Sequence, residues 1–171
     1  MSCYVLTMRN ILRLRKIKPS DAKYFLKLWT NKELIALTSG RPVEPAEKLM
    51  GYFARLLDEE HNYLIVLDGK VIGHVMIVRR GKDSFGFPIV IGEAKYRGRG
   101  YGSRAIRKIL NIGFFKLGYK EARLEVRPEN TRAIKTYRSL GFKPIRIRSY
   151  DNPYQPKVLV MVLAKDSFVA S

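Results

Sequence analysis

Apolar residues recur at two different periods along the chain. In several short segments they alternate with polar residues, which is typical of half-buried β-strands. These segments are residues 10–17, 62–67, 71–80, 85–92, 122–126, 142–150 and 157–163. Elsewhere apolar residues recur every three to four positions, which indicates amphipathic helices that begin after residues 19–21, at Pro45, after Gly102 and at Asn130. This order predicts a mixed α/β domain, with one central sheet of six to seven strands and about four helices.

The length and composition of the chain agree with a single domain. A chain of 171 residues that is 46% hydrophobic can bury a core, and no linker, repeat or low-complexity tract divides it. We expect one domain over residues 1–171, with residues 1–9 as a loosely ordered N-terminal segment. No apolar run reaches the roughly 20 residues of a membrane span, and the first residues do not resemble a signal peptide, which predicts a cytoplasmic protein. One cysteine, Cys3, and two histidines, His61 and His74, argue against a metal site.

Three glycines at alternate positions mark the turn between a predicted strand and a predicted helix. Gly98, Gly100 and Gly102 follow the apolar run of residues 89–91 and precede the helical stretch. Glycine lets a backbone approach a ligand closely, and the first turn of a helix offers unpaired N–H groups to an anion. Ser103 stands where a dinucleotide fingerprint needs its third glycine, and no Gly-Lys-Ser/Thr ending of a Walker loop is present. The pattern therefore predicts a phosphate-binding loop of another kind.

Two segments together resemble one family. The pattern Arg97-x-x-Gly100-x-Gly102 resembles the acyl-CoA pyrophosphate loop of the GCN5-related N-acetyltransferases (GNAT family). About 30 residues later come a strand, Asn130, Tyr137 and a Gly-Phe pair at residues 141–142, which resemble the second half of the same family's signature. The order and spacing of both segments make the resemblance much more specific than either motif alone.

The resemblance implies direct transfer of an acetyl group from acetyl-CoA to an amine, without a covalent enzyme intermediate. It assigns the pyrophosphate to the loop, the pantetheine arm to the preceding strand, a carbonyl-binding N–H to the region of Ile91, and the general acid to Tyr137. The implied cofactor-binding residues are Val90, Ile91, Gly92, Arg97, Gly98, Arg99, Gly100, Tyr101, Gly102, Ser103, Asn130 and Tyr137.

The general base is less clear from the sequence. Some family members place a Glu about eleven residues before the Arg97 position, but this chain has Gly86 there. Residues 124–130, Leu-Glu-Val-Arg-Pro-Glu-Asn, are similar to a segment of the N-terminal protein acetyltransferases, which would make Glu125 the base. Two alternatives remain: Glu125 belongs to a solvated face of charges, or the base is Glu93 at the end of the strand before the loop.

The same resemblance narrows the choice of the acceptor amine. An α-amino group, with a pKa of about 8, is more easily presented as a neutral amine than a lysine with a pKa of about 10.4. Trp29, Glu93, Tyr150 and Tyr154 are the candidate substrate-binding residues. We expect a protein N-terminus of the ribosomal-protein type, with a polyamine or an aminoglycoside as the alternative.

The chain carries an unusual excess of positive charge. Its net charge is +18 and its pI is about 10.2. Residues 96–148 hold 15 Lys and Arg against 3 Asp and Glu, so much of the excess surrounds the predicted cofactor loop. This charge favours an anionic partner such as RNA or a ribosome, or else a background common to the proteins of the source organism. The alternative from another functional class is therefore a basic RNA-binding module, or an acyl-CoA-binding module without catalysis. The sequence does not distinguish a monomer from a dimer.

Overall fold

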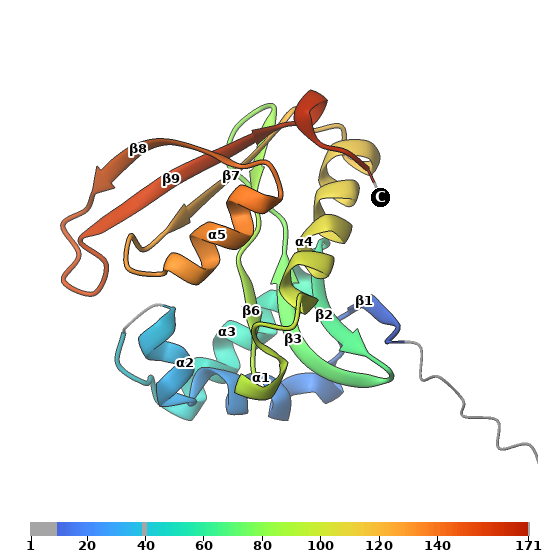
Figure 1. Cartoon of the computed structure of the whole chain (residues 1–171). Coiled ribbons are helices and arrows are strands. Elements are labelled where there is room, and N and C mark those ends of the chain that lie inside the picture. Colours follow the sequence, from blue (N-terminus) through green and yellow to red (C-terminus); the bar gives the residue numbers. More distant parts are fainter. Residues whose placement is uncertain (1–9, 39–40, 171) are drawn as a thin grey trace, which may run out of the picture.

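The computed structural model describes residues 10–38 and 41–170. Strands and helices build two sheets with helices on both sides, which confirms the predicted mixed α/β class (Figure 1). The expectation for residues 1–9 lies outside the described part of the chain.

The first sheet contains four strands in the order β1-β2-β3-β6, all antiparallel. Their bounds are β1 Leu12–Lys16, β2 Asn62–Leu67, β3 Lys70–Met76 and β6 Ile89–Ile91. The turn between β2 and β3 is the predicted Asp-Gly pair, and both residues have positive φ, +48° for Asp68 and +80° for Gly69. These are the angles of a type I′ turn, which matches the twist of the strands that it joins.

The second sheet contains five strands in the order β4-β5-β7-β9-β8. Their bounds are β4 Val78–Arg79, β5 Ser84–Gly86, β7 Glu121–Val126, β9 Lys157–Ala164 and β8 Lys143–Ser149. Only β5 and β7 run parallel, through the short register Ser84↔Glu121 and Phe85↔Ala122. Beyond this register, at residues 123–126, which we call the upper part of β7, no described strand pairs with β7 on the side that faces β6.

The division into two sheets differs from the single sheet that the sequence predicted. The predicted strands 71–80 and 85–92 are each interrupted, the first at Ile77 and the second at Phe87 and Pro88. Proline has no N–H to donate to a ladder. Ile77 and Phe87 are buried, and the N–H of Ile77 bonds the carbonyl of His61 instead of a strand partner. The interruption turns one long hairpin from the first sheet into the second, so that β6 and β7 diverge.

Helices cover both faces of the first sheet, and one helix, α5, lies beside the second sheet. They are α1 Ala22–Trp29, α2 Lys32–Leu37, α3 Ala46–Asp58, α4 Tyr101–Asn111 and α5 Thr131–Ser139. Neighbouring residues of β2 show the two faces: Leu64 packs in a cluster with Phe25 of α1 and Phe53 of α3, whereas Ile65 belongs to the larger core with α4. Period-2 alternation in a strand produces this division.

Helix α2 is an element that the sequence did not predict. It has six residues, and its N-cap Asn31 accepts a hydrogen bond from the N–H of Leu34 at 2.9 Å. Such a short helix shows fewer than two turns of apolar period, which is too little for a pattern to detect.

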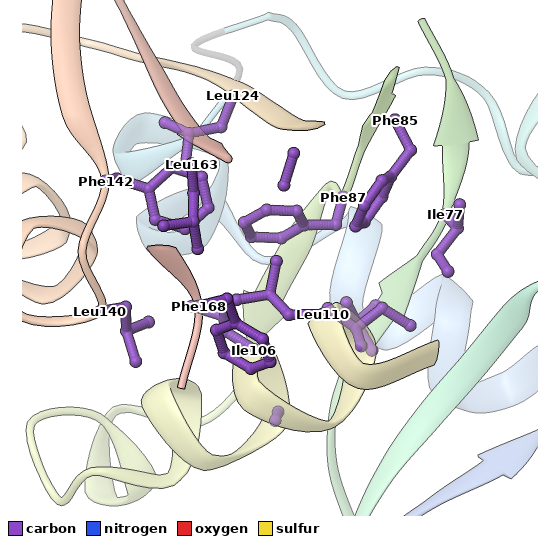
Figure 2. Packing of buried hydrophobic residues seen from close by; sticks show 14 of the residues in the cluster. Ile77, Phe85, Phe87, Ile106, Leu110, Leu124, Leu140, Phe142, Leu163 and Phe168 are labelled. Atoms are coloured by element: carbon purple, nitrogen blue, oxygen red, sulfur yellow. The ribbon is translucent and has the colours of Figure 1, made fainter. Parts of the chain in front are cut away.

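The larger core joins the second sheet to α4 through aromatic side chains. Phe85 of β5 packs against Phe114 with ring centroids 5.5 Å apart, and Phe87 packs against Phe142 at 5.7 Å; Figure 2 labels Phe85, Phe87 and Phe142 among their neighbours. Gly113 makes this possible, because a Cβ there would lie 2.2 Å from the Phe85 ring. The chain around it, Ile112–Lys116, forms a π-helical turn that continues α4. This packing fixes α4, and hence the glycine loop, relative to both sheets.

Candidate active site

The site lies where β6 and β7 diverge. The N–H of Gly92 donates to the carbonyl of Ile72 at 2.9 Å, and the N–H of Met76 donates to the carbonyl of Pro88 at 3.2 Å. Backbone groups alternate in direction along an antiparallel strand. The even-numbered residues of this segment therefore bond β3, and the N–H of Ile91 is directed to the open side.

The glycine loop has the geometry of an anion-binding site. Gly98 and Gly100 have φ of +74° and +78°, which favours glycine, and Gly100 is the N-cap of α4. No side chain among the described residues caps this helix, and its first turn holds no acidic residue. The first N–H groups of α4 and the positive end of its dipole are therefore available to a phosphate.

A cavity of about 430 Å³ extends from this loop along β6 to α5. Most of the residues predicted to bind the cofactor line it, namely Val90, Ile91, Arg97, Gly98, Gly100, Gly102, Ser103, Asn130 and Tyr137. We call it the cofactor cavity. Arg99, Tyr101 and Gly92 do not line it, and a Cβ at Gly92 would lie 3.0 Å from Leu28 and 3.2 Å from the Tyr24 hydroxyl.

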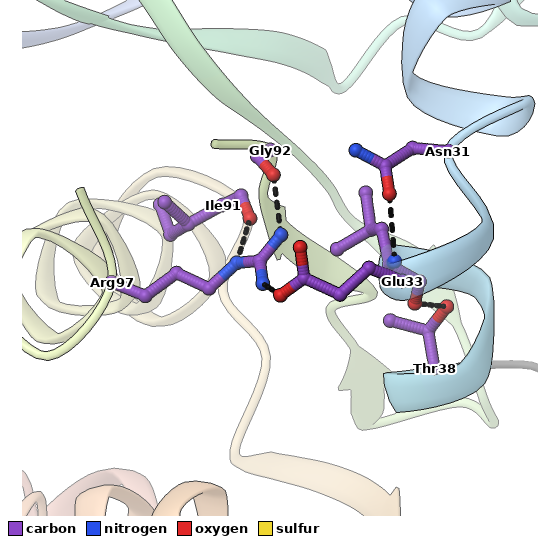
Figure 3. Close-up of polar contacts among 7 residues, drawn as sticks. Asn31, Glu33, Thr38, Ile91, Gly92 and Arg97 are labelled. Carbon is purple, nitrogen blue, oxygen red and sulfur yellow. Dashed lines mark hydrogen bonds and ion pairs between the residues drawn. The ribbon is translucent and has the colours of Figure 1, made fainter. Parts of the chain in front are cut away.

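Arg97 acts within the protein. Its Nε donates to the carbonyl of Ile91 at 3.0 Å, a terminal nitrogen donates to the carbonyl of Gly92 at 2.5 Å, and the other lies 2.7 Å from Glu33 (Figure 3). The side chain is only 8% exposed. Arg97 therefore holds the end of β6 against α2, and the loop offers backbone N–H groups rather than the guanidinium of Arg97 to a phosphate. Arg104 is likewise bonded to a carbonyl, that of Asn10.

Tyr137 stands between two cavities. It comes from α5, which begins at its N-cap Asn130, and its ring lies 6.3 Å from that of Phe87 and 5.9 Å from that of Phe142. Burial raises the pKa of Tyr137 to about 12. Its hydroxyl has no hydrogen-bond partner within residues 10–38 and 41–170. Tyr137 is therefore a protonated donor that is free to act on a bound group.

The second cavity, of about 370 Å³, lies between β5, the upper part of β7 and α2. Tyr137, Asn130 and Ile89 line both this cavity and the cofactor cavity. Its charged lining residues are Arg80, Arg123, Glu125 and Arg127. Because it meets the cofactor cavity at Tyr137, we call it the acceptor cavity.

Among the residues that the structure describes, Glu125 is the one carboxylate that lines the acceptor cavity. It accepts a hydrogen bond of 2.7 Å from the Tyr150 hydroxyl and lies 3.6 Å from Arg148. This hydrogen bond raises the pKa of Tyr150, which keeps the hydroxyl protonated. Glu125 is 35% exposed, so its carboxylate is open to a ligand as well as to its partners. Its neighbour Arg123 pairs with Glu121 at 2.9 Å instead.

The other candidate residues lie elsewhere. Glu93 pairs with Lys95 at 2.9 Å, which lowers the pKa of Glu93, and it lines neither cavity. The Tyr154 side chain is exposed and lines neither cavity, although its carbonyl accepts a hydrogen bond from Arg127. Trp29 packs on Phe25 at 5.1 Å.

Trp29 lines a third cavity, of about 420 Å³, with Tyr52 and His74. Burial lowers the pKa of His74 to about 4, and its Nε2 bonds the side-chain carbonyl of the buried Asn62. His74 is thus neutral and donates from Nε2, which suits a packing role.

Sequence reasoning missed three residues of the site, from two segments of the chain. Leu37 and Thr38, at the end of α2, line both the cofactor and the acceptor cavity. Arg80, from the β4–β5 hairpin, lines the acceptor cavity. The N-cap Asn31 was a usable signal for α2, whereas the position of Arg80 depends on how the hairpin crosses between the sheets.

Two kinds of feature are absent from the described residues. They contain no group of three or more His, Cys, Asp or Glu that could hold a metal ion. None of their helices is both long and apolar enough to cross a membrane.

Comparison with known proteins identifies the family. Residues 12–143 match the model of the acetyltransferase (GNAT) domain. The chain is 28% identical over 139 residues to spermidine N(1)-acetyltransferase of Escherichia coli, covering 77% of this chain and 72% of that one. It is 34% identical over 101 residues to N-alpha-acetyltransferase RimI of Mycobacterium tuberculosis, covering 56% of this chain and 61% of that one.

Solved structures show the same fold. A spermidine N-acetyltransferase of Vibrio cholerae, in complex with CoA and spermine, matches with a TM-score of 0.78 and 21% identity over 91% of this chain and 96% of that one. The aminoglycoside acetyltransferase AAC(6')-Ib in complex with coenzyme A matches with a TM-score of 0.77 and 19% identity over 92% of this chain and 96% of that one. With the family model matched over most of its length, the chain belongs to the GNAT acetyltransferase family, an acetyl-CoA-dependent class of enzymes.

Proposed function

We propose that this N-acetyltransferase transfers the acetyl group to a primary amine of a small molecule that binds in the acceptor cavity. The observation that carries the proposal is the position of Tyr137, which lines both cavities and keeps its proton. A group bound from the loop side and an amine bound from the β7 side would therefore meet at its hydroxyl.

The cofactor cavity fits acetyl-CoA. The backbone of the loop supplies N–H groups for the pyrophosphate, and the open side of β6 supplies strand-like partners for the amide-bearing arm. Bound acetyl-CoA supplies a thioester, whose acetyl carbon is open to attack by an amine. The N–H of Ile91, directed into the opening, is placed to stabilise the negative charge that develops on the carbonyl oxygen.

Tyr137 and Glu125 divide the proton transfers in this proposal. Tyr137 donates a proton to the sulfur that leaves, which requires a protonated hydroxyl, and burial keeps it so. Glu125 attracts the ammonium form of the acceptor and takes, directly or through water, the proton that frees its lone pair. The nitrogen loses its second proton as the amide forms, and this proton replaces the one that Tyr137 gives to the sulfur. The hydrogen bond from Tyr150 holds the carboxylate in place for this role.

The size of the acceptor cavity and the names of the relatives support a small acceptor. A volume of about 370 Å³ lies in the range of small-molecule pockets. Relatives named for spermidine and aminoglycosides act on small amines. These comparisons support the small-molecule alternative better than the protein N-terminus that the sequence led us to expect.

A protein N-terminus remains the second candidate, because Glu125 and Tyr150 do meet. Both residues were selected by similarity to N-terminal acetyltransferases, and they share a 2.7 Å hydrogen bond. The relative named as an N-alpha-acetyltransferase has the higher identity, over a shorter part of the chain.

One assay separates these acceptors. The protein is incubated with acetyl-CoA and, in turn, a monoamine, spermidine, an aminoglycoside, a lysine peptide and a set of N-terminal peptides, while free thiol is followed. We expect turnover with a small primary amine. Turnover confined to the N-terminal peptides would transfer the proposal to the second candidate. Binding of acetyl-CoA without release of the CoA thiol, in the presence of any of these amines or of the anionic amines named in the next subsection, would refute catalysis at this site.

A further inference from the structure

We infer that the acceptor carries an anionic group, a carboxylate or a phosphate, which Arg80 binds while Glu125 receives the amine. This inference rests on the proposed function and specifies the class of its substrate. It follows from the distribution of charge in the acceptor cavity.

Arg80 occupies a space that a glycine leaves open. A Cβ at Gly86 would lie 3.0 Å from Nε and 3.4 Å from Cγ of Arg80, so the arginine side chain lies directly over this glycine. Gly86 is the position at which the family resemblance led us to look for a carboxylate. The chain has a guanidinium over that position instead, so the sign of the local charge is opposite to the sign expected.

The other arginines around the cavity already have partners. Arg123 pairs with Glu121 at 2.9 Å, and Arg148 lies 3.6 Å from Glu125. Arg127 donates to the carbonyls of Ala36 and Tyr154. In contrast, no hydrogen bond or ion pair of the Arg80 side chain is found in the described ranges, although Ser84 accepts from its backbone N–H.

Arg80 and Glu125 face the same cavity. Both line the acceptor cavity, and the Tyr150 hydroxyl holds the Glu125 carboxylate through a hydrogen bond of 2.7 Å. A guanidinium binds a carboxylate or a phosphate through two parallel hydrogen bonds, and it is charged at every accessible pH. An amine with an anionic group would therefore satisfy both residues at once.

The same charges disfavour a polycation, so the acceptor inferred here is a small amine of a different charge from those for which the relatives are named. The lining of the acceptor cavity holds three arginines and one glutamate. An acceptor with several ammonium groups would place all but one of them near guanidinium groups, and like charges brought together oppose binding. A zwitterionic or anionic amine has no such penalty.

The experiment compares matched amines by kcat/KM. One series is 4-aminobutanoate, its amide, butylamine and 1,4-diaminobutane, which share a four-carbon chain; a second is O-phosphoethanolamine against ethanolamine. We expect the anionic member of a series to exceed the neutral member by at least about tenfold, and the diamine to be the poorest substrate. The two series distinguish a carboxylate from a phosphate. Raising the salt concentration should reduce the preference.

Variants assign the preference to Arg80. Arg80→Gln should reduce the ratio of anionic to neutral substrate to about one, and Arg80→Glu should invert it in favour of the diamine. Arg79→Gln is the matched control, because Arg79 is the neighbouring arginine, is bonded to the carbonyl of Gly81 and does not line the acceptor cavity. It should keep the ratio of the unaltered protein.

Failure of this inference is distinct from failure of the proposed function. If neutral amines or diamines are acetylated as well as anionic ones, and Arg80→Gln leaves the ratio unchanged, the enzyme stands and the inference is overturned. If no amine is acetylated, the anion site is tested by binding alone, by titrating the CoA-loaded protein with N-acetyl-4-aminobutanoate and with N-acetylphosphoethanolamine. Binding that Arg80→Gln weakens supports the anion site, and absence of binding for both compounds refutes it.

Discussion

The cofactor cavity and the acceptor cavity meet at Tyr137, but the first presents mainly backbone groups to a ligand and the second presents mainly side chains. The cofactor cavity presents backbone: two glycines with positive φ, the first turn of α4 and the open side of β6. Even its best-placed arginine, Arg97, is directed at carbonyl groups of the chain. The acceptor cavity presents side chains, chiefly Glu125, Arg80 and Arg123.

This difference separates the binding of the cosubstrate, which is the same in every reaction, from the selection of the acceptor. Backbone groups bind the part of a cosubstrate that never changes, and they depend on chain conformation rather than on side-chain identity. Side chains select the acceptor, because their charge can change without altering the fold. Mutations in the acceptor cavity should therefore change which substrate is used, whereas those in the loop should change affinity for acetyl-CoA with every acceptor.

The largest effect is expected where the cavities meet. Tyr137→Phe removes a hydroxyl and leaves the ring, so turnover should fall by roughly 10² to 10⁴ while acetyl-CoA affinity, measured by titration calorimetry, is kept. Tyr119→Phe is the control, since Tyr119 packs on Phe85 and lines neither cavity. With a pKa of about 12, Tyr137 stays protonated at lower pH, so the rate should show no alkaline decline up to about pH 10. Unchanged turnover in Tyr137→Phe would make this residue structural.

Glu125→Gln tests the acceptor side. We expect kcat/KM to fall by about 10² at neutral pH and to recover partly at alkaline pH, where the free amine loses its proton unaided. The pH–rate profile is the measurement. Glu121→Gln is matched to it, because Glu121 lies on the same face of β7, four residues away, and pairs with Arg123. If both variants have the profile of the unaltered protein, Glu125 belongs to a solvated charge face.

Gly102→Val tests the cofactor side. A Cβ at this position would meet only Ile91, at 3.9 Å, so the fold accommodates the side chain, which then obstructs the approach of a phosphate to the backbone. Acetyl-CoA affinity should fall by well over tenfold, by roughly the same factor whichever amine is present. Gly51→Val, in a helix with open space around it, controls for the valine itself. Equal affinity in the two variants would remove the loop from the binding site.

Glu33→Gln should have the smallest effect. It removes the ion pair with Arg97, in which Glu33 is 61% exposed. Exposed ion pairs contribute little to stability, and Arg97 keeps its hydrogen bonds to two carbonyl groups. Acetyl-CoA affinity should therefore change by less than about fivefold. Glu60→Gln, at a far more exposed glutamate, is the control. A loss beyond tenfold would show that α2 positions the cofactor as strongly as the glycine loop does.

The same contrast explains what could be predicted from sequence. Glycines such as Gly100 indicate where the backbone takes a positive φ, and the Asn130 cap with the period of the following residues predicted the helix α5 that carries Tyr137. Arg80 could not be placed, because its position follows from the interruption at Phe87 and Pro88, and these residues continue an alternating pattern that looks like one strand. The single sheet expected from that pattern is two sheets, and six-residue α2 was too short to show a period.

The long hairpin that runs from the first sheet into the second and back also has a consequence for biosynthesis. Every strand of the first sheet lies within residues 12–91, so this sheet can pair as soon as the first half of the chain has left the ribosome. β4 and β5 are made before β6, but β7, which pairs with β5, and β8 and β9 come later. The nascent chain therefore carries β5 as an unpaired strand edge until residues 121–126 emerge. During that interval the first sheet can already be complete, whereas the second sheet still lacks β7, β8 and β9.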